Sequence, residues 1–209
     1  MTTPQRGAVA VLEIRPANEA TWHDLATVFG TRGPSSRCWC QRYKLKRLEN
    51  FADQPVEERQ ARLRDQTGCG DPCAPATSGL VAYLDGEPAG WCAVEPRPEF
   101  PGLRHSPVPW HDRDEDPADP TVWAITCVLA RAGFRRRGVS KALIRAAVEH
   151  ARARGAARLE AYPMTTTRVI SEELHLGTLQ SYLEAGFTLV GRPTLRRAVV
   201  EIIFDPSRG

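Results

Sequence analysis

Apolar and polar positions along the chain form short blocks that predict strands and helices in mixed order. Apolar runs at residues 80–84 and 89–95 flank Asp85-Gly86, a dipeptide typical of a tight hairpin turn. Residues 139–154 repeat apolar side chains at helical spacing, which predicts an amphipathic helix ending at Gly155. The expected strands are 9–15, 80–84, 89–95, 121–129, 158–162, 187–190 and 196–204, and the expected helices are 18–29, 38–48, 56–66, 139–154 and 178–185. This order of elements predicts a mixed α/β sheet.

The chain of 209 residues is long enough for a sizeable core, and we expect residues 1–209 to form one domain. Irregular insertions are expected at about 96–120 and 163–177. The first insertion is rich in proline, and a loop of this length is usually functional or disordered. Its acidic residues could attract a polycationic amine or could simply be solvated. They are Asp112, Asp114, Glu115 and Asp116.

Composition and charge limit the class of protein and the kinds of partner to be expected. Charged residues make up 25% of the chain and hydrophobic residues 42%, which is ordinary for a globular domain. The formal net charge of +3 does not require a nucleic-acid partner. No apolar run is long enough to span a membrane, and the N-terminus lacks the apolar core of a signal peptide. We therefore expect a cytoplasmic protein with neither a membrane nor a nucleic acid as partner.

The six cysteines suggest packing rather than a metal site. Cys92 and Cys127 lie in apolar strand patterns, so we expect them to be buried and reduced. The remaining four could form a thiolate zinc site, but their spacing departs from the usual two-residue gaps between ligands. These four are Cys38, Cys40, Cys69 and Cys73. We expect no metal, and packed or exposed thiols instead.

A loop between the apolar run 123–129 and the helix 139–154 carries the strongest chemical signal. It reads Arg135-x-x-Gly138-x-Ser140 and leads directly into the helix. The first backbone N–H groups of a helix have no partner within it, and the helix dipole favours an anion there. Glycine at 138 allows close approach of the backbone. With Arg136 and Arg137 beside it, the loop is suited to binding pyrophosphate. It is not a nucleotide-triphosphatase P-loop, because no Lys-Ser/Thr follows Gly138 in register.

A second motif, Tyr182-x-x-x-Gly186-Phe187, follows at the end of the next predicted helix. With both motifs in this order, the chain resembles the GNAT acetyltransferase superfamily. Its marks are Arg or Gln, two residues, Gly, one residue, then Gly or Ala, and later Tyr-x-x-x-Gly-Phe. The resemblance implies an α/β (α+β) fold: a mixed, mostly antiparallel sheet with splayed central strands and flanking helices. The chain departs from the family at Ser140, where glycine or alanine is usual, and at His175, where asparagine is usual.

The resemblance also implies acetyl-CoA as cosubstrate, lying between strands 123–129 and 158–162. The strand backbone would bind the pantetheine arm, and the loop amides and arginines would bind the pyrophosphate. The implied cofactor-binding residues are Val128, Leu129, Ala130, Arg135, Arg136, Arg137, Gly138, Val139, Ser140 and Lys141. Tyr182 would protonate the departing CoA thiolate, because a phenol is neutral at pH 7 and can donate a proton. The alternative is that Tyr182 only packs against the cofactor or the core.

The motifs say less about the residues that bind and deprotonate the acceptor amine. We prefer Glu160 as general base, because it lies on the strand lining the expected cleft while Leu159 and Ala161 face the sheet's other side. Glu95, at the end of the neighbouring hairpin strand, is the second candidate for the base and a candidate for contact with the acceptor. Either glutamate could instead be a solvated charge at a strand end. Trp39 could form a wall of the acceptor pocket or pack in the core. His175 could bind substrate, relay a proton or lie on a surface loop.

The expected reaction is direct attack of a primary amine on acetyl-CoA in a ternary complex. A small-molecule acceptor is favoured because the two insertions could enclose one, and an aminoglycoside-like compound is one candidate. The alternatives are a protein or peptide N-acetyltransferase and a non-catalytic acyl-CoA-binding module. A homodimer is one possible assembly.

Overall fold

The computed structural model describes residues 10–168 and 173–205. Its longer elements are β1 (Leu12–Pro16), α1 (Trp22–Phe29), α2 (Ser35–Cys38), α3 (Val56–Thr67), β2 (Gly79–Leu84), β3 (Glu87–Pro96), β4 (Val122–Ala130), α4 (Val139–Ala153), β5 (Arg158–Ala161), α5 (Leu179–Leu183), β6 (Thr188–Thr194) and β7 (Arg197–Ile203). Short 3-10 turns include η3 (Arg97–Glu99), η4 (Pro101–His105) and η5 (Leu174–Leu176). Among these described residues, no helix combines the length and apolarity needed to cross a membrane.

The strands form one seven-stranded sheet in the order β1-β2-β3-β4-β5-β7-β6. Every neighbouring pair is antiparallel except β4 and β5, whose parallel pairing requires the crossover through α4. Asp85 and Gly86 join β2 to β3 with φ angles of 55° and 82°, which are the positive values that a two-residue primed turn requires. The predicted mixed, mostly antiparallel sheet with flanking helices is therefore confirmed.

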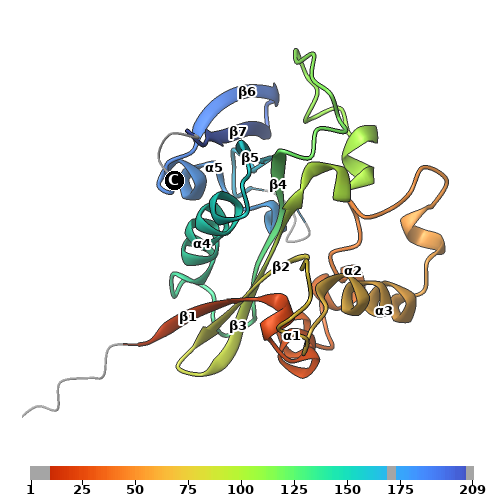
Figure 1. The fold of residues 1–209 in the computed structure, drawn as a ribbon, viewed down its shortest axis with the longest axis vertical. Helices are drawn as coiled ribbons and strands as arrows, with labels where there is room; N and C mark the ends of the chain where they lie inside the picture. Colours follow the sequence, from red (N-terminus) through yellow and green to blue (C-terminus); the bar gives the residue numbers. More distant parts are fainter. Residues whose placement is uncertain (1–9, 169–172, 206–209) are drawn as a thin grey trace, which may run out of the picture.

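Helices cover both faces of the sheet (Figure 1). The apolar side of α4 packs on one face, where Leu143, Ile144 and Ala147 are fully buried. The segment from α1 to α3 covers the other face, with Leu25 and Leu63 buried beneath it. Glu160 also lies on this second side, whereas Leu159 and Ala161 belong to the α4 side, as expected from strand alternation.

The central strands β4 and β5 splay apart. They pair only from Val122 to Ile125 of β4, and β5 ends at Ala161 while β4 continues to Ala130. In the described part of the chain, the last residues of β4 therefore pair with β3 alone. Splaying of these two strands was predicted. It leaves backbone groups of β4 available along one edge.

An irregularity in β4 was not predicted. The register between β3 and β4 shifts so that Ala93 faces Cys127 while its neighbour Val94 faces Ile125, which leaves Thr126 as an extra residue. Such a bulge reverses the face to which the following side chains point. Cys127 and Leu129 consequently join the α1 side of the sheet, and Val128 joins the α4 side.

The helix predicted at 38–48 is wrong. The structure has the short helix α2, followed by Trp39 and Cys40 with φ angles of 45° and 56°. Two successive left-handed residues end a right-handed helix, and they turn the Trp39 side chain into the core. The strand predicted at residues 9–15 starts at Leu12 in the structure, and residue 9 lies outside the described residues. Of the insertion predicted at 163–177, residues 169–172 also lie outside the described residues.

Candidate active site

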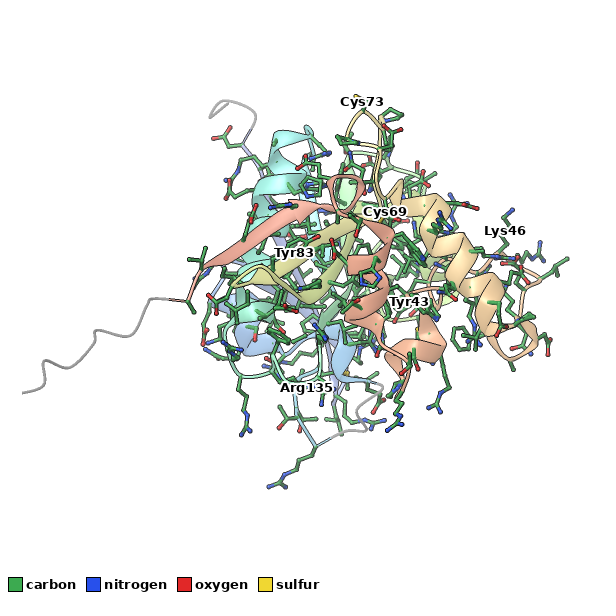
Figure 2. The ribbon with its side chains drawn as sticks, turned by 90° about the horizontal axis from the view of Figure 1, so that it is seen from below. Tyr43, Lys46, Cys69, Cys73, Tyr83 and Arg135 are labelled. Carbon is green, nitrogen blue, oxygen red and sulfur yellow. The ribbon has the colours of Figure 1, made fainter. Side chains whose placement is uncertain are left out.

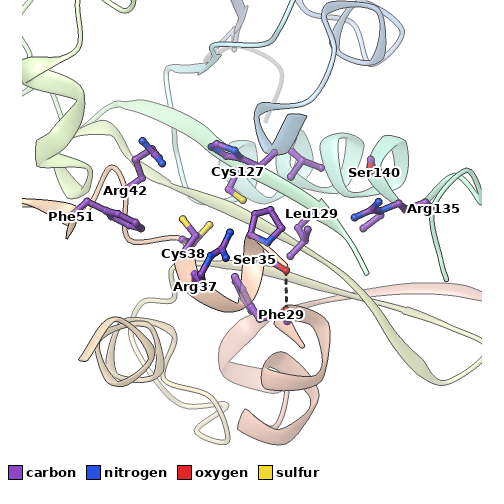
Figure 3. A pocket seen from close by; sticks show the side chains of 15 residues that line it. Phe29, Ser35, Arg37, Cys38, Arg42, Phe51, Cys127, Leu129, Arg135 and Ser140 are labelled. Atoms are coloured by element: carbon purple, nitrogen blue, oxygen red, sulfur yellow. Dashed lines mark hydrogen bonds between the residues drawn. The ribbon is translucent and has the colours of Figure 1, made fainter. Parts of the chain in front are cut away.

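A pocket of about 390 Å³ opens beside the free edge of β4. Figure 3 shows Arg135 and Ser140 toward one end and Arg42 and Phe51 toward the other. The pocket is lined by Phe29, Pro34, Ser35, Arg37, Cys38, Cys40, Arg42, Phe51, Cys127, Val128, Leu129, Ala130, Arg135, Ser140 and His175. It thus joins the last residues of β4 and the start of α4 to the segment around α2.

One end of the pocket reaches the first turn of α4. Gly138 precedes the helix with φ 83° and ψ −7°, and no side chain caps the helix. The N–H groups of the first turn consequently have no side-chain acceptor, which suits an anion. Arg135 and Ser140 line the pocket here; that they bind a cofactor stays a prediction.

The other loop residues predicted to bind the cofactor do not line this pocket. Arg136 has φ 60°, and Arg137 lies 3.8 Å from the Asp85 carboxylate. The Lys141 ammonium pairs with Glu184 at 2.6 Å. Val139 is buried against Gly90 of β3, so that its side chain seats the helix on the sheet. Backbone groups of this loop and of the first turn of α4 remain candidates for phosphate binding.

The backbone of β4 forms one wall of the pocket. Val128, Leu129 and Ala130 all line it, as predicted for the pantetheine-binding strand. Because the described residues pair no strand with this edge, alternate N–H and C=O groups can accept an extended ligand as if it were another strand. The bulge at Thr126 adds the Cys127 side chain to the lining.

Three thiols meet in the middle of the pocket. Cys38 and Cys40 come from the segment after α1 and face Cys127 of β4. The Trp91 indole N–H donates to Cys40 Sγ at 3.1 Å. A hydrogen bond with the Cys40 thiol and burial raise the pKa of Cys127 well above its usual range, and burial raises the pKa of Cys38. The Cys38 and Cys127 thiols are therefore neutral at pH 7 and weakly nucleophilic.

The cysteines considered as zinc ligands do not assemble. Cys69 Sγ donates to Thr67 Oγ1 at 3.2 Å, and Cys73 is exposed. Figure 2 shows Cys73 at the side of the molecule remote from Arg135, which lines the pocket together with Cys38 and Cys40. Within residues 10–168 and 173–205, no group of three or more Cys, His, Asp or Glu side chains is arranged to hold a metal ion.

Tyr182 lies just behind the pocket wall. Its side chain is fully buried and stacks edge-on against Phe187, with ring centroids 5.2 Å apart. The Tyr182 hydroxyl donates to the Leu176 carbonyl at 3.1 Å. Leu176 is the neighbour of His175, which lines the pocket. Burial, together with the nearby Cys92 and Cys127, raises the pKa of Tyr182 well above its usual range, so its proton is retained.

Glu160 is not placed as a general base. Its side chain is fully buried, does not line the pocket and accepts a hydrogen bond from Tyr162 at 2.9 Å. Arg113 donates to the same carboxylate at 2.6 Å, and the Arg158 guanidinium lies 3.0 Å away. The carboxylate is thus enclosed and has no access to a substrate in the pocket. The interpretation of Glu160 as general base is therefore corrected to a structural one.

The acidic insertion belongs to the same network. Glu115 pairs with Arg97 at 3.0 Å, with Arg113 at 2.6 Å and with Arg158. Although burial opposes it, hydrogen bonds from Arg97 and Arg158 lower the pKa of Glu115 from 4.5 to about 2. Glu115, whose side chain is 23% exposed, therefore fastens the insertion to β5 and is already paired with cations of the protein.

Two further candidates for contact with the acceptor lie outside the pocket. Trp39 is 5% exposed and stacks on Phe29 and Trp22, with ring centroids 4.9 and 5.7 Å away. Glu95 is buried and forms an ion pair with Lys44, while burial raises the pKa of its carboxyl. Both are corrected from binding residues to core residues. His175 is the acceptor-side candidate that the structure places in the lining.

The sequence reasoning missed the contribution of the segment around α2. Assigning a helix to residues 38–48 hid the fact that Cys38 and Cys40 could point the same way, with Trp39 between them in the core. Arg37 and Arg42 also enter the lining from this segment. The available signal was the Cys-Trp-Cys triplet flanked by arginines.

The sequence matches a known protein family. A family model described as the acetyltransferase (GNAT) family matches residues 39–176. No curated protein matches the sequence significantly.

Three solved structures are similar in fold. The Salmonella typhimurium protein yncA, solved with its cofactor acetyl-CoA, is 14% identical over 95% of this chain and 96% of that chain, with a TM-score of 0.56. A ribosomal-protein-alanine N-acetyltransferase from Brucella melitensis is 15% identical over 92% and 99%, with a TM-score of 0.54. An N-acetyltransferase from Staphylococcus aureus Mu50 is 13% identical over 92% and 98%, with a TM-score of 0.55. At these identities the likeness shows the fold.

Proposed function

Because the chain belongs to the acetyltransferase (GNAT) family, we propose that it transfers an acetyl group from acetyl-CoA to a primary amine of a small molecule. The observation that carries this proposal is the continuity of the pocket. It runs from the uncapped start of α4, along the free edge of β4, to a recess bounded by the α2 segment.

The described residues fit acetyl-CoA. The first turn of α4, with Arg135 beside it, offers N–H groups and positive charge to the pyrophosphate. The backbone of Val128, Leu129 and Ala130 offers strand-like hydrogen bonds to the two amides of pantetheine. When bound, acetyl-CoA supplies an activated thioester. In this orientation its sulfur lies toward Cys127, away from the phosphate end.

Direct transfer in a ternary complex is supported by the state of the thiols. The acceptor nitrogen forms its bond to the acetyl carbon as the bond between carbon and sulfur breaks. An acetyl-cysteine intermediate would need a thiolate, and the raised pKa values of Cys38 and Cys127 disfavour one. A backbone N–H on the free edge of β4 polarises the carbonyl in this proposal.

Proton movements are assigned to Tyr182 and His175. Tyr182 keeps its proton at neutral pH and is hydrogen-bonded to the residue next to His175, so it can protonate the departing thiolate. His175 replaces Glu160 as the proposed acceptor of the amine's proton, because it lines the pocket and a neutral imidazole nitrogen can accept a proton.

His175→Gln should lower kcat roughly 100-fold, because the amine loses its proton acceptor. It should also weaken the fall of kcat/KM toward acidic pH, since a general base is inactive when it is protonated; thiol release at several pH values measures both effects.

A thiol-release assay with acetyl-CoA tests the proposal. The acceptor panel contains amino acids, aminoglycosides, polyamines and short peptides with free N-termini. We expect CoA release that depends on a small-molecule amine, with the acetylated product identified by mass spectrometry. Acetylation of peptides alone would favour the protein N-acetyltransferase alternative. Tight CoA binding without acetylated product from any member would favour a binding module and contradict the proposal.

A further inference from the structure

The described lining of the pocket carries arginines and no carboxylates. Arg37, Arg42 and Arg135 belong to it, and no aspartate or glutamate among the described residues does. We infer, resting on the proposed function, that the acceptor is a small amine that also carries an anionic group, and that Arg42 binds that group. The site thereby selects amino-acid-like amines over polycations.

The position of Arg42 separates it from the phosphates of CoA. Arg135 lies at the end of the pocket next to α4, where pyrophosphate accounts for its charge. Arg42 lies toward the opposite end beside Phe51 (Figure 3). Between them lie Cys127 and Cys38, so Arg42 is on the acceptor side of the expected thioester.

The Arg42 guanidinium packs over an aromatic ring and has no carboxylate partner among the described residues. Its guanidinium carbon lies 5.2 Å from the centroid of the Phe51 ring, which also lines the pocket. Within residues 10–168 and 173–205, Arg42 forms no ion pair. Two glutamates pair with other cations instead: Glu49 with Arg62 at 2.8 Å, and Glu95 with Lys44. A stacked guanidinium loses little freedom on binding an anion, so its charge is available to a ligand.

The chemistry of guanidinium determines the ligand class. Its planar donors match carboxylate or phosphate oxygens in a bidentate arrangement. Arg37, which is exposed, also lines this pocket. A polycationic acceptor would meet these charges without a compensating carboxylate in the described lining. The pocket therefore disfavours the aminoglycoside-like acceptor considered from the sequence.

Matched acceptors test this inference. Glutamate, glutamine and lysine share the α-amino acid backbone and differ in side-chain charge. Comparing each amino acid with its α-amide measures the contribution of the α-carboxylate alone. O-phosphoserine against serine separates phosphate from carboxylate recognition. We expect kcat/KM at least about tenfold higher for acceptors that retain the anionic group than for their neutral counterparts.

Variants of Arg42 locate the effect. Arg42→Ala should raise the KM for anionic acceptors about tenfold and leave the KM for acetyl-CoA unchanged, while Arg42→Lys should restore part of the loss. Lys46→Ala is the matched control, because Lys46 is an exposed cation in the same segment that does not line the pocket.

Two results would overturn the inference while leaving acetyl transfer intact. Neutral or cationic acceptors could be used as well as anionic ones, or Arg42→Ala could raise only the KM for acetyl-CoA.

A second readout does not depend on turnover. N-acetylglutamate should raise the thermal unfolding temperature of the CoA-saturated protein, and Arg42→Ala should abolish that shift. Absence of the shift in the wild type contradicts the inference, whereas absence of product from every amine contradicts the proposed function.

Discussion

At the scale of single residues, the pocket relies on groups whose protons stay in place. Burial keeps Tyr182 and Cys38 neutral, burial and a hydrogen bond with Cys40 do the same for Cys127, and the Glu160 carboxylate is held by arginines. In the proposed reaction, the amine therefore meets few charges besides the arginines of the described lining. Sequence motifs identified Tyr182, but they could not show that Glu160 is enclosed by arginines from a distant insertion.

Replacing Tyr182 by Phe tests its role as acid. We expect kcat to fall roughly 100-fold, because the departing thiolate loses its proton donor, while the KM for acetyl-CoA changes little. Loss of the hydrogen bond to Leu176 should cost only about 1 kcal/mol of unfolding free energy. Tyr162→Phe is the matched control, since Tyr162 is equally buried and bonds to Glu160 away from the pocket. Unchanged turnover in Tyr182→Phe would contradict the assignment.

Glu115 provides a prediction on pH and stability. Its pKa is lowered from 4.5 to about 2 in the folded protein, so its ionised form stabilises the fold above pH 4.5. That contribution is lost as pH falls from 4.5 toward 2. Glu115→Gln should cost roughly 2 kcal/mol at pH 7, and the difference from wild type should shrink over that acidic range.

Urea unfolding at several pH values measures this effect. The control is Asp112→Asn, because the Asp112 side chain is 90% exposed and its loss should change stability by less than about 0.5 kcal/mol. Equal destabilisation by both variants, or a difference that does not vary with pH, would show that the insertion is not fastened through Glu115.

At the scale of elements, strand β4 sets the geometry of the pocket. Its apolar run, its approximate ends and its splay from β5 could be predicted, because they follow from hydrophobic pattern and from the motif after it. The bulge at Thr126 could not, since it depends on the register with β3 rather than on any local preference. It is nevertheless the bulge that adds Cys127 to the pocket.

Gly90 couples β3 to the phosphate end of the pocket. A Cβ at this position would lie 2.6 Å from Val139 Cγ1 and 2.7 Å from the Leu129 carbonyl oxygen. Gly90→Ala should therefore displace the start of α4 and weaken CoA binding about tenfold or more, measured by calorimetry. Gly191→Ala is the control, because nothing lies within 4 Å of its Cβ position. Equal CoA affinity in both variants would contradict the coupling.

At the scale of the whole molecule, the pocket unites segments far apart in sequence. The half formed by β4 and the start of α4 was predicted, because one continuous motif encodes it. The half formed around α2 was not, because Trp39 reaches the core only through stacking on Phe29 and Trp22. Tertiary packing of this kind overrides the local preference for helix at residues 38–48.

The pathway of acetyl transfer is a property of this combined pocket. With neutral thiols on either side, acetyl-CoA should leave no acetyl group on the protein when amine is absent. Intact-protein mass spectrometry after incubation with acetyl-CoA measures this directly, and Cys38→Ser should retain kcat within a fewfold. An acetyl adduct on a pocket cysteine that is discharged by added amine would show a covalent route instead.

The central claim is that acetyl-CoA lies along the free edge of β4 with its phosphates at the start of α4. A crystal structure of the protein with CoA tests this claim most directly. We predict pyrophosphate oxygens within hydrogen-bonding distance of the first-turn N–H groups of α4, pantetheine paired with the backbone of residues 128–130, and the thiol beside Cys127. CoA bound elsewhere, or bound with its thiol pointing away from Cys127 and Arg42, would contradict it.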